Sequence, residues 1–515
     1  MNHALILPIL LPMFSGCLLL LGGRLLAING QRILSLLATL ALLPLAGGLV
    51  AQAATGPLQV YALGNWVAPF GIVLVLDRLS ALLLLVTALL ALFALLYAVR
   101  GDDQRGASFH ALFQFQLMGI NGAFLTGDLF NLFVFFEILL LASYGLLLHG
   151  GGKLRTRAGL HFVVINLAGS TLFLFAVGTL YGILGTLNMA DLARQVAMLP
   201  PEHLGPVKAA GLLLFGVFAL KGALIPLHLW LPGAYANTSA PVAALFAIMT
   251  KVGAYSILRL DTLIFGAAAG SLSGLISGWV LPLALATLVV GMLGVLAATA
   301  LRQQIAYLVV ASVGSLLTAF GLGSSAGIAA GLYYLPHASF AAGAFFLLAG
   351  SISSRRGEHD DRFLPGVMLT DRIVLGTLFF LVAVLIAGLP PLSGFIGKWL
   401  TLKAAVDHAW MPWVLAVVLA TSLLAVIAMA RAGNVLFYRS EAPEVNRPTV
   451  RTERLSRELL PAAGLVALCV ALVIWAGPVD EFTRATADQL LAPETYVRAV
   501  LGTDITPGVQ PGVQP

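Results

Sequence analysis

The sequence predicts an all-α polytopic membrane protein with about 14 transmembrane helices and two inverted five-helix repeats, each containing a proline-broken helix. Of the 515 residues, 60% are hydrophobic and only 10% are charged, whereas soluble globular chains carry about 25% charged residues. Apolar runs long enough to cross a bilayer core of about 30 Å recur along the whole chain. Basic residues also gather in alternate loops, as they do in multi-pass proteins.

The apolar runs begin at the amino terminus. The first run lacks the basic stretch and the small-residue cleavage site of a secretory signal, so we expect it to be a membrane span. The predicted spans lie at 3–22, 33–53, 79–99, 111–126, 129–149, 160–184, 207–228, 241–264, 275–298, 304–324, 327–350, 373–400, 409–437 and 460–477. An even number of spans places both termini on one side of the membrane.

The distribution of Lys and Arg predicts the orientation. With the spans placed as above, 18 of the 28 basic residues fall in one set of alternate loops and 6 in the other set with the termini. Loops rich in Lys and Arg remain in the cytoplasm. We therefore expect a bacterial inner (plasma) membrane protein with both termini on the periplasmic or external side. The formal charge of +6 reports this orientation and does not indicate nucleic-acid binding.

Two predicted spans are interrupted by proline close to a lysine, and they define the repeats. Pro226 follows Lys221 in the seventh span, and Pro390 precedes Lys398 in the twelfth. The two lie five spans apart, so the units that contain them would be inverted, as in many secondary transporters. The expected divisions are an N-terminal three-helix segment at 1–105, repeats at 106–270 and 271–437, a cytoplasmic loop, last span and external segment at 438–505, and a disordered tail at 506–515.

Cofactor chemistry has no support in the sequence. Cys17 and Cys469 stand alone in apolar runs and no Cys-x-x-Cys motif occurs, which argues against iron–sulfur clusters, structural zinc and a disulfide framework. No glycine-rich phosphate loop follows a strand. We predict no cofactor, no metal site and no catalytic residue.

Glu137 is the only acidic residue at the centre of a predicted span. It lies nine residues after Asp128, the expected helix cap, or about 13.5 Å along the helix, too far for its side chain to reach the interface. Burial disfavours the charged form of an ionisable group, and a nearby opposite charge favours that form again. Lys221 is the most economical partner, and a pair that forms and breaks would suit proton transfer. A static ion pair that only fixes helix packing is the alternative.

Further basic residues lie deep in other spans. Lys251 is near the centre of the eighth span and has no carboxylate beside it in sequence. His337 lies about ten residues into the eleventh span and titrates in a range that suits a proton relay, although a hydrogen-bonded packing role stays open. Lys398 would be the last group of the relay; in the competing interpretation, its side chain extends outward to the membrane interface. We expect proton transfer along the groups in the order Glu137, Lys221, Lys251, His337 and Lys398.

Three residues at the breaks are candidate supporting groups. His228 closes the broken seventh span near an interface, where an ordinary packing role is the competing interpretation. Pro226 and Pro390 remove helical hydrogen-bond donors and so interrupt the two helices.

The segments that carry these groups resemble a known family. TGDLFNLFVFFEILLLASYGLLLHGG at 126–151 and ALKGALIPLHLWLPGAYANTSAPVAALFAIMTKVGAYSILR at 219–259 resemble the D-type subunit of the multisubunit Mrp-type (Pha/Mnh) Na⁺/H⁺ antiporters. They are similar, more distantly, to the antiporter-like subunits of respiratory complex I. The resemblance implies fourteen helices with two inverted repeats. It also implies that the five relay candidates match the family's conserved acid, lysines and histidine.

The chain departs from the family pattern in two places. Ala338 and Ala342 stand where many relatives carry a second histidine and a lysine, and Gly233 replaces the acidic residue of the WLPDA-type turn. The middle of the predicted relay therefore needs bridging water or must depend on His337 alone.

The resemblance implies a proton-translocating subunit of a multisubunit Na⁺ or K⁺/proton antiporter, a secondary transporter driven by the proton motive force. Its expected partners are other membrane subunits, protons, Na⁺ or K⁺ and the lipid bilayer, with no nucleic acid. One alternative is a proton-pumping membrane-arm subunit of a complex I-like or hydrogenase-like redox complex. Another is a scaffold that transports nothing.

Overall fold

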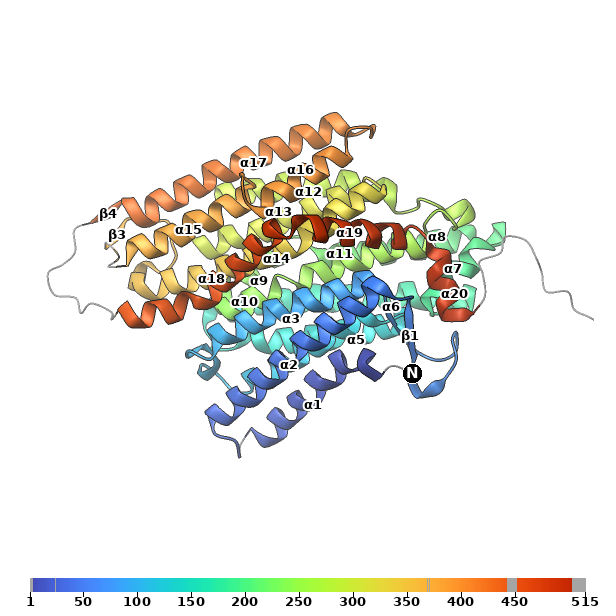
Figure 1. Cartoon of the computed structure of the whole chain (residues 1–515), viewed down its shortest axis with the longest axis horizontal. Helices are drawn as coiled ribbons and strands as arrows, with labels where there is room; N and C mark the ends of the chain where they lie inside the picture. Colours follow the sequence, from blue (N-terminus) through green and yellow to red (C-terminus); the bar gives the residue numbers. More distant parts are fainter. Residues whose placement is uncertain (1–2, 24, 368, 370, 442–451, 503–515) are drawn as a thin grey trace, which may run out of the picture.

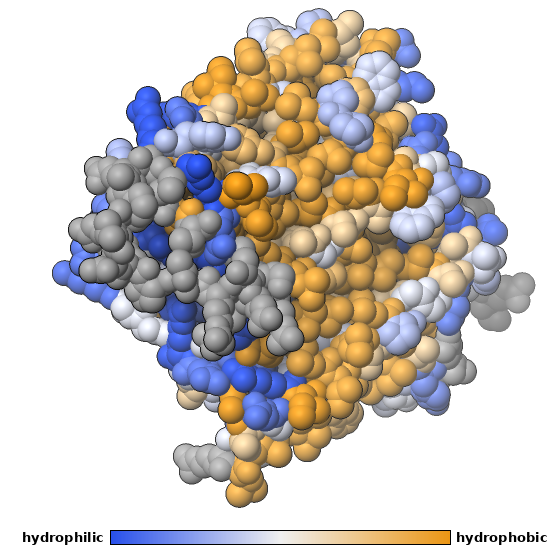
Figure 2. All heavy atoms as spheres, turned by 60° about the vertical axis from the view of Figure 1, so that its left-hand side comes forward, coloured by the Kyte–Doolittle hydropathy of each residue, from blue (hydrophilic) through white to orange (hydrophobic). Residues whose placement is uncertain are grey.

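The structure, a computed structural model, describes residues 3–23, 25–367, 369, 371–441 and 452–502. Most of its helices lie side by side along the long axis of the molecule (Figure 1). Figure 2 shows a broad band of hydrophobic residues flanked by hydrophilic residues at both ends of the bundle. This is the surface expected of a protein surrounded by lipid, in which helices satisfy their own backbone polar groups.

Ten helices in the described residues are long and apolar enough to cross a membrane, or eleven if the bent pair α18–α19 counts as one span. Each of the fourteen predicted spans falls on helix. The segments outside the ten are shorter or broken; they are 3–22, 111–126, 373–400 and 460–477. The number fourteen therefore stays a prediction, as does the inverted repeat.

The N-terminal segment contains α1 (Leu7–Gly22), α2 (Ile28–Thr55) and α3 (Arg78–Ala98), with a hairpin of β1 (Gln59–Ala62) and β2 (Val73–Leu76) between the last two. The strands are antiparallel, with Gln59 opposite Leu76. Asp77 caps α3 through a reciprocal hydrogen-bond pair with Ser80, the capping-box arrangement that satisfies two free amides. The hairpin was not predicted from the sequence.

The next part of the chain holds the first predicted repeat. Its helices are α4 (Phe109–Leu125), α5 (Leu129–Leu148), α6 (Lys153–Leu184), α7 (Met189–Ala197), α8 (Leu204–Gly222), α9 (Trp230–Asn237), α10 (Ala240–Phe246) and α11 (Met249–Arg259), followed by a π-helical turn, η5 (Leu260–Ile264). Asp128 accepts a 2.8 Å hydrogen bond from the Asn131 amide, which confirms it as the cap of α5. The short amphipathic α7 was not predicted.

The remainder holds the second predicted repeat and the C-terminal helices. These are α12 (Ser277–Ala297), α13 (Leu301–Phe320), α14 (Ser325–Arg356), α15 (Arg372–Ala387), α16 (Ser393–Ala404), α17 (Met411–Gly433), α18 (Thr452–Ile474), α19 (Ala476–Leu490) and α20 (Pro493–Leu501), with the parallel strands β3 (Gly366–Val367) and β4 (Ser440–Glu441). Single turns complete the described chain: η1 (His3–Leu5), η2 (Leu63–Asn65), η3 (Asp102–Gln104), η4 (Pro201–His203), η6 (Gly270–Leu272), η7 (Gly357–His359) and η8 (Asn434–Tyr438).

The ends of the described chain lie together. η1 contacts β2 and α20 contacts β1, its partner strand, and both lie at the end of the molecule away from β3 and β4 (Figure 1). After α18 the chain bends by 81° into α19, which packs on α14. The predicted tail at 506–515 lies outside the described residues.

The centre of the bundle is formed by α10–α11 and α14. In the most apolar stretch of Ala240–Ile264, 100% of the residues are buried, and in that of the α14 segment 94% are. In the corresponding stretches of α2 and α17, only 33% of the residues are buried. A helix that is apolar on all sides and fully buried belongs in a protein core, and a half-buried one faces lipid. Three of the five predicted relay residues belong to α11, α14 and the adjoining α8, so the fold brings them into its interior.

Candidate functional site

Glu137 and Lys221 both interact with α6, which packs between their helices. Ser170 on α6 donates a short hydrogen bond to the half-buried Glu137 carboxylate. One turn earlier on the same helix, Asn166 accepts from Lys221 Nζ through its side-chain oxygen at 3.2 Å and its backbone carbonyl at 3.3 Å. In the part of the chain that the structure describes, the two charged groups form no direct ion pair; they interact electrostatically across α6.

The orientation of the Asn166 amide suits this contact. Its Nδ2 donates to the Phe162 carbonyl at 2.9 Å, which leaves the side-chain oxygen free to accept from an ammonium. Lys221 is 5% exposed and Asn166 is 1% exposed. Lys221 Nζ also lies 5.9 Å from the centre of the Phe136 ring. The lysine therefore has polar acceptors in an interior that would otherwise disfavour its charge.

The break after Lys221 falls where the sequence predicted it. α8 ends at Gly222, one residue after the lysine, and Ala223 adopts a left-handed conformation. The Trp230 indole donates to the Leu220 carbonyl at 3.0 Å, and the Ile225 amide donates to Thr287 on α12. Side chains thus supply the hydrogen bonds that the helix loses at its end, as a broken helix in a membrane requires.

The supporting residues of this break lie between α8 and α9. Pro226 is within the irregular segment, as expected. His228 is 6% exposed, and its Nδ1 has no hydrogen-bond partner among the described residues. Its position fits a packing residue, since it contacts neither Lys221 nor Glu137 by any hydrogen bond or ion pair in the described chain.

Lys251 lies at a second break, which was not predicted from the sequence. α10 ends at Phe246 and α11 begins at Met249, so the predicted eighth span is interrupted two residues before the lysine. Lys251 is fully buried, and its Nζ donates to Ser312 Oγ on α13 at 3.1 Å and to the neighbouring Thr250 at 3.4 Å. Its side chain ends inside the bundle and does not reach an interface.

His337 lies on α14 in a group of hydroxyls. Its Nδ1 is 2.9 Å from Ser393 Oγ, the first residue of α16, and its ring lies 5.4 Å from that of Tyr334. The Tyr334 side chain also interacts with Ser315 on α13, one turn after Ser312. His337 interacts electrostatically with both Lys251 and Lys398, and so lies between the two lysines.

Lys398 extends its side chain inward, toward the second predicted break. Its Nζ donates to the Ala387 carbonyl at 2.7 Å and to Ser422 Oγ on α17 at 2.9 Å. Ala387 is the last residue of α15, and a cation at a helix C-terminus interacts favourably with the free carbonyls there. Pro390 lies in the short connection between α15 and α16, as expected.

The structure therefore groups the predicted residues into two parts. Glu137 and Lys221 flank α6, while Lys251 on α11, His337 on α14 and Lys398 on α16 follow one another. The polar residues that bond to these groups were not predicted from the sequence; they are Asn166, Ser170, Ser312, Ser393 and Ser422. Isolated Ser and Asn in apolar helices are common, because they bond to their own backbone, so only the fold distinguishes these five.

The chain is similar to known membrane proteins along most of its length. Residues 126–425 match the protein family described as NADH:quinone oxidoreductase/Mrp antiporter, TM. The chain is 43% identical to a probable K(+)/H(+) antiporter D-type subunit of Rhizobium meliloti (strain 1021), over 97% of this chain and 98% of the relative. It is 37% identical to a Na(+)/H(+) antiporter D-type subunit of Alkalihalophilus pseudofirmus, over 97% of this chain and 100% of the relative.

Two solved structures share the fold along nearly the whole chain. A chain of the Mrp complex from Dietzia sp. DQ12-45-1b superposes with a TM-score of 0.85 and 27% identity, covering 98% of this chain and 100% of that one. A chain of respiratory complex I from Thermus thermophilus with bound NADH gives a TM-score of 0.76 and 27% identity, covering 95% and 99%.

Proposed function

The chain belongs to the NADH:quinone oxidoreductase/Mrp antiporter family of membrane subunits, and from this premise we propose that it is the proton-translocating subunit of a multisubunit Na⁺ or K⁺/H⁺ antiporter. It is a transporter subunit and not an enzyme. It works in the plasma membrane with other membrane subunits, and the proton motive force drives the exchange. Full-length similarity to antiporter subunits named for K⁺ and for Na⁺ supports the antiporter class. Because the two relatives are named for different cations, the transport assay has to include both.

The observation that carries this proposal is the series of buried basic residues with hydroxyl and amide partners. Each intramembrane lysine carries a solvation cost that is offset by partners such as Asn166 and Ser312. Such neutral partners leave the proton exchangeable, whereas a tight carboxylate pair would hold the charge in place. The series leads from Lys251 past His337 to Lys398, and a serine hydroxyl accompanies each of the three.

Glu137 and Lys221 form the switch at the start of this series. With Lys221 bonded to Asn166, the carboxylate interacts with Ser170 and only weakly with the lysine. Movement of the lysine side chain toward Glu137 would form the ion pair and favour the charged form of both groups. Movement back would weaken the pair and release a proton toward Lys251. The relay order is then Glu137, Lys221, Lys251, His337 and Lys398.

The proposal is tested in inside-out vesicles that contain the complete complex. A pH-sensitive dye reports whether Na⁺ or K⁺ collapses a preformed proton gradient. We expect Glu137→Gln and Lys221→Ala to abolish the response, while Lys208→Ala, an exposed lysine on the same helix α8, retains it. A native gel checks that each variant complex assembles.

Two results would contradict the proposal. Full exchange by the Glu137→Gln and Lys221→Ala variants in an intact complex would contradict the relay and favour the alternative that the chain is a scaffold that transports nothing. A gradient that NADH builds through the complex, with no response to Na⁺ or K⁺, would favour the redox alternative.

A further inference from the structure

A polar cavity of about 770 Å³ lies at the end of the bundle that carries β3 and β4, away from the relay residues. It is bounded by the end of α3, the turn η3, and parts of α6, α10, α13, α14 and α18. The lining includes four arginines from three segments: Arg100 and Arg105 from the connection between α3 and α4, Arg155 from α6 and Arg302 from α13. Neither the proposed proton relay nor the helix breaks use any of them.

The carboxylates near this cavity are already paired. Asp102 lies 3.1 Å from Arg105, and Glu458 lies 2.8 Å from Arg355, which is outside the lining. Arg302 contacts Asp360 at 2.6 Å and Asp361 at 3.2 Å. Each of these acidic groups therefore contacts an arginine other than Arg100 and Arg155, and Asp102 acts on Arg155 only at longer range.

Arg100 and Arg155 have no carboxylate partner among the described residues. Arg155 donates to the Asn237 carbonyl at 2.8 Å and to the His149 carbonyl. The Arg100 side chain makes no hydrogen bond or ion pair in the described chain, although Glu458 lies within electrostatic range. Arg100 is exposed and Arg155 is half-buried. An arginine in a protein stays charged, so both guanidinium groups can take an anion as a partner.

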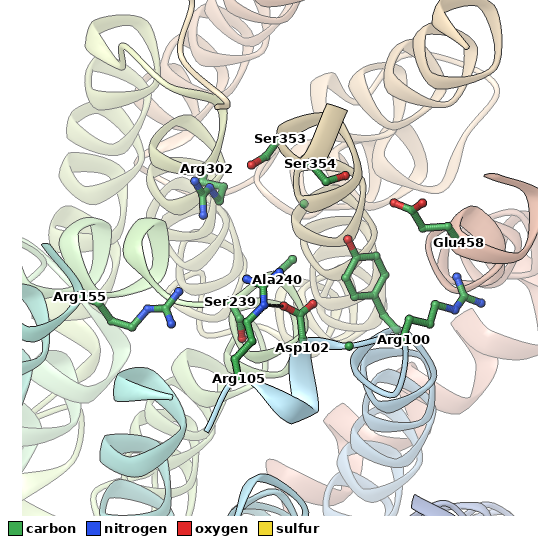
Figure 3. A pocket seen from close by; sticks show the side chains of 13 residues that line it. Arg100, Asp102, Arg105, Arg155, Ser239, Ala240, Arg302, Ser353, Ser354 and Glu458 are labelled. Carbon is green, nitrogen blue, oxygen red and sulfur yellow. Dashed lines mark ion pairs between the residues drawn. The ribbon is translucent and has the colours of Figure 1, made fainter. Parts of the chain in front are cut away.

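A neutral donor faces the same space. Ser239 is 4% exposed, lines the cavity, and its hydroxyl has no hydrogen-bond partner in the described residues. Figure 3 shows Arg155 and Arg302 entering from different helices around Ser239, with Arg100 and Glu458 on the far side. Buried hydroxyls normally find a partner, so this one points to a group that the protein alone does not supply.

We propose that this cavity binds a phosphate-bearing anion through Arg100, Arg155 and Ser239. Guanidinium groups bind phosphate oxygens with two parallel hydrogen bonds, and they repel metal cations. The volume exceeds that of a single inorganic ion and accommodates the headgroup of an anionic phospholipid. Basic pockets between membrane helices on the cytoplasmic side commonly bind such headgroups. A soluble phosphate compound offers the same chemistry.

The bound anion would lie where the N-terminal segment and the two predicted repeats meet. Arg100 follows α3 and Arg155 belongs to α6, whereas Arg302 and the serines Ser353 and Ser354 belong to α13 and α14. Neutralising the arginines would reduce their mutual repulsion across this junction. The proposal is independent of the proton relay, so its test uses binding and thermal stability in place of transport.

The test uses the complete complex, purified in detergent and stripped of lipid. Thermal unfolding is measured with phosphatidylglycerol, with phosphatidylcholine, with inorganic phosphate, and with chloride at matched ionic strength. Native mass spectrometry counts the bound phospholipid. The variants are Arg100→Gln, the charge-retaining Arg100→Lys, and Arg157→Gln as matched control, because Arg157 is an exposed arginine of α6 outside the cavity.

We expect phosphatidylglycerol, but not phosphatidylcholine or chloride, to stabilise the wild type and Arg157→Gln. Arg100→Gln should bind one phosphatidylglycerol molecule fewer and show about tenfold weaker stabilisation, as expected for the loss of one charge-assisted contact. Arg100→Lys should fall between them. Stabilisation by inorganic phosphate alone, lost in Arg100→Gln, would support the site and identify a soluble ligand.

Two outcomes would overturn the proposal. The first is equal binding and equal stabilisation by Arg100→Gln and Arg157→Gln, which would show that phosphate acts elsewhere on the complex. The second is an absence of any effect of phosphatidylglycerol or inorganic phosphate on the thermal stability of the wild type. A native gel establishes that the variants assemble before either comparison is made.

Discussion

Asn166 is the residue that separates the predicted acid–lysine pair. It holds Lys221 by two acceptors, while Ser170, one turn later on α6, holds Glu137. The sequence identified both charged groups, because an acid and a lysine in apolar spans are conspicuous. It could not identify the amide between them, since an asparagine that bonds to its own helix has the same appearance in sequence.

Asn166→Asp should trap Lys221 in a new ion pair. The new carboxylate would lie about 3 Å from the lysine ammonium, a distance at which the attraction in a poorly solvated site exceeds that of the neutral amide several-fold. We expect cation-dependent dissipation of the proton gradient to fall about tenfold or more with the complex intact. The vesicle dye assay measures this. Thr171→Val, an exposed position on α6, is the control, and unchanged exchange in Asn166→Asp would contradict the switch.

Ser393 is the corresponding residue beside His337, and its loss should weaken the second part of the relay. Ser393→Ala removes the partner of the imidazole Nδ1, which fixes the tautomer and orientation of the ring. We expect exchange to fall several-fold in the dye assay, and Ser393→Thr, which keeps the hydroxyl, to restore it. Ser339→Ala is the control, because the Ser339 hydroxyl donates to the Leu335 carbonyl of its own helix and to nothing else among the described residues. Equal losses in both alanine variants would indicate a packing effect.

At the scale of the element, the sequence predicted the breaks that proline causes and missed the break that packing causes. α8 ends at Gly222, before Pro226, and α15 ends before Pro390, since proline lacks the amide that continues a helix. The break at Ala247–Ile248 contains neither proline nor glycine. It arises where α10 and α11 pass through the fully buried centre, and local propensity carries no signal for such a tertiary effect.

The crossing of α8 and α11 should be the least tolerant contact near the relay. A Cβ on Gly253 would lie 2.4 Å from the Gly222 amide nitrogen and 2.8 Å from its Cα, so the two backbones would have to separate next to Lys221. Gly253→Ala should destabilise the chain by about 1–3 kcal/mol, the range for an overpacked core. Thermal unfolding of the purified complex measures the loss. Gly216→Ala on α8, whose Cβ would meet nothing within 4 Å, should be neutral or stabilising, and equal effects would contradict the close contact.

At the scale of the whole molecule, hydrophobicity predicted the helical bundle but not the short helices and the hairpin that pack at its end. The amphipathic α7 and α20 contact each other and were missed, because short amphipathic helices lack the continuous apolar run that marks a span. The hairpin β1–β2 was missed for the same reason. Long apolar helices are determined by composition, whereas these pieces are determined by the surfaces against which they pack.

The orientation of the whole bundle is the last expectation open to a direct test, and the cavity proposal depends on it. The test starts from a chain in which the exposed Cys17 is replaced by serine, while the buried Cys469 is kept. A cysteine placed at the exposed position Glu202, at the end of the bundle that holds the termini, should react with a membrane-impermeant maleimide in intact cells. A cysteine at exposed Arg157 should react only after permeabilisation. Labelling in the reverse order would contradict this orientation. It would also place the arginine cavity against the external leaflet, out of reach of the anionic lipids of the cytoplasmic leaflet that attract basic residues.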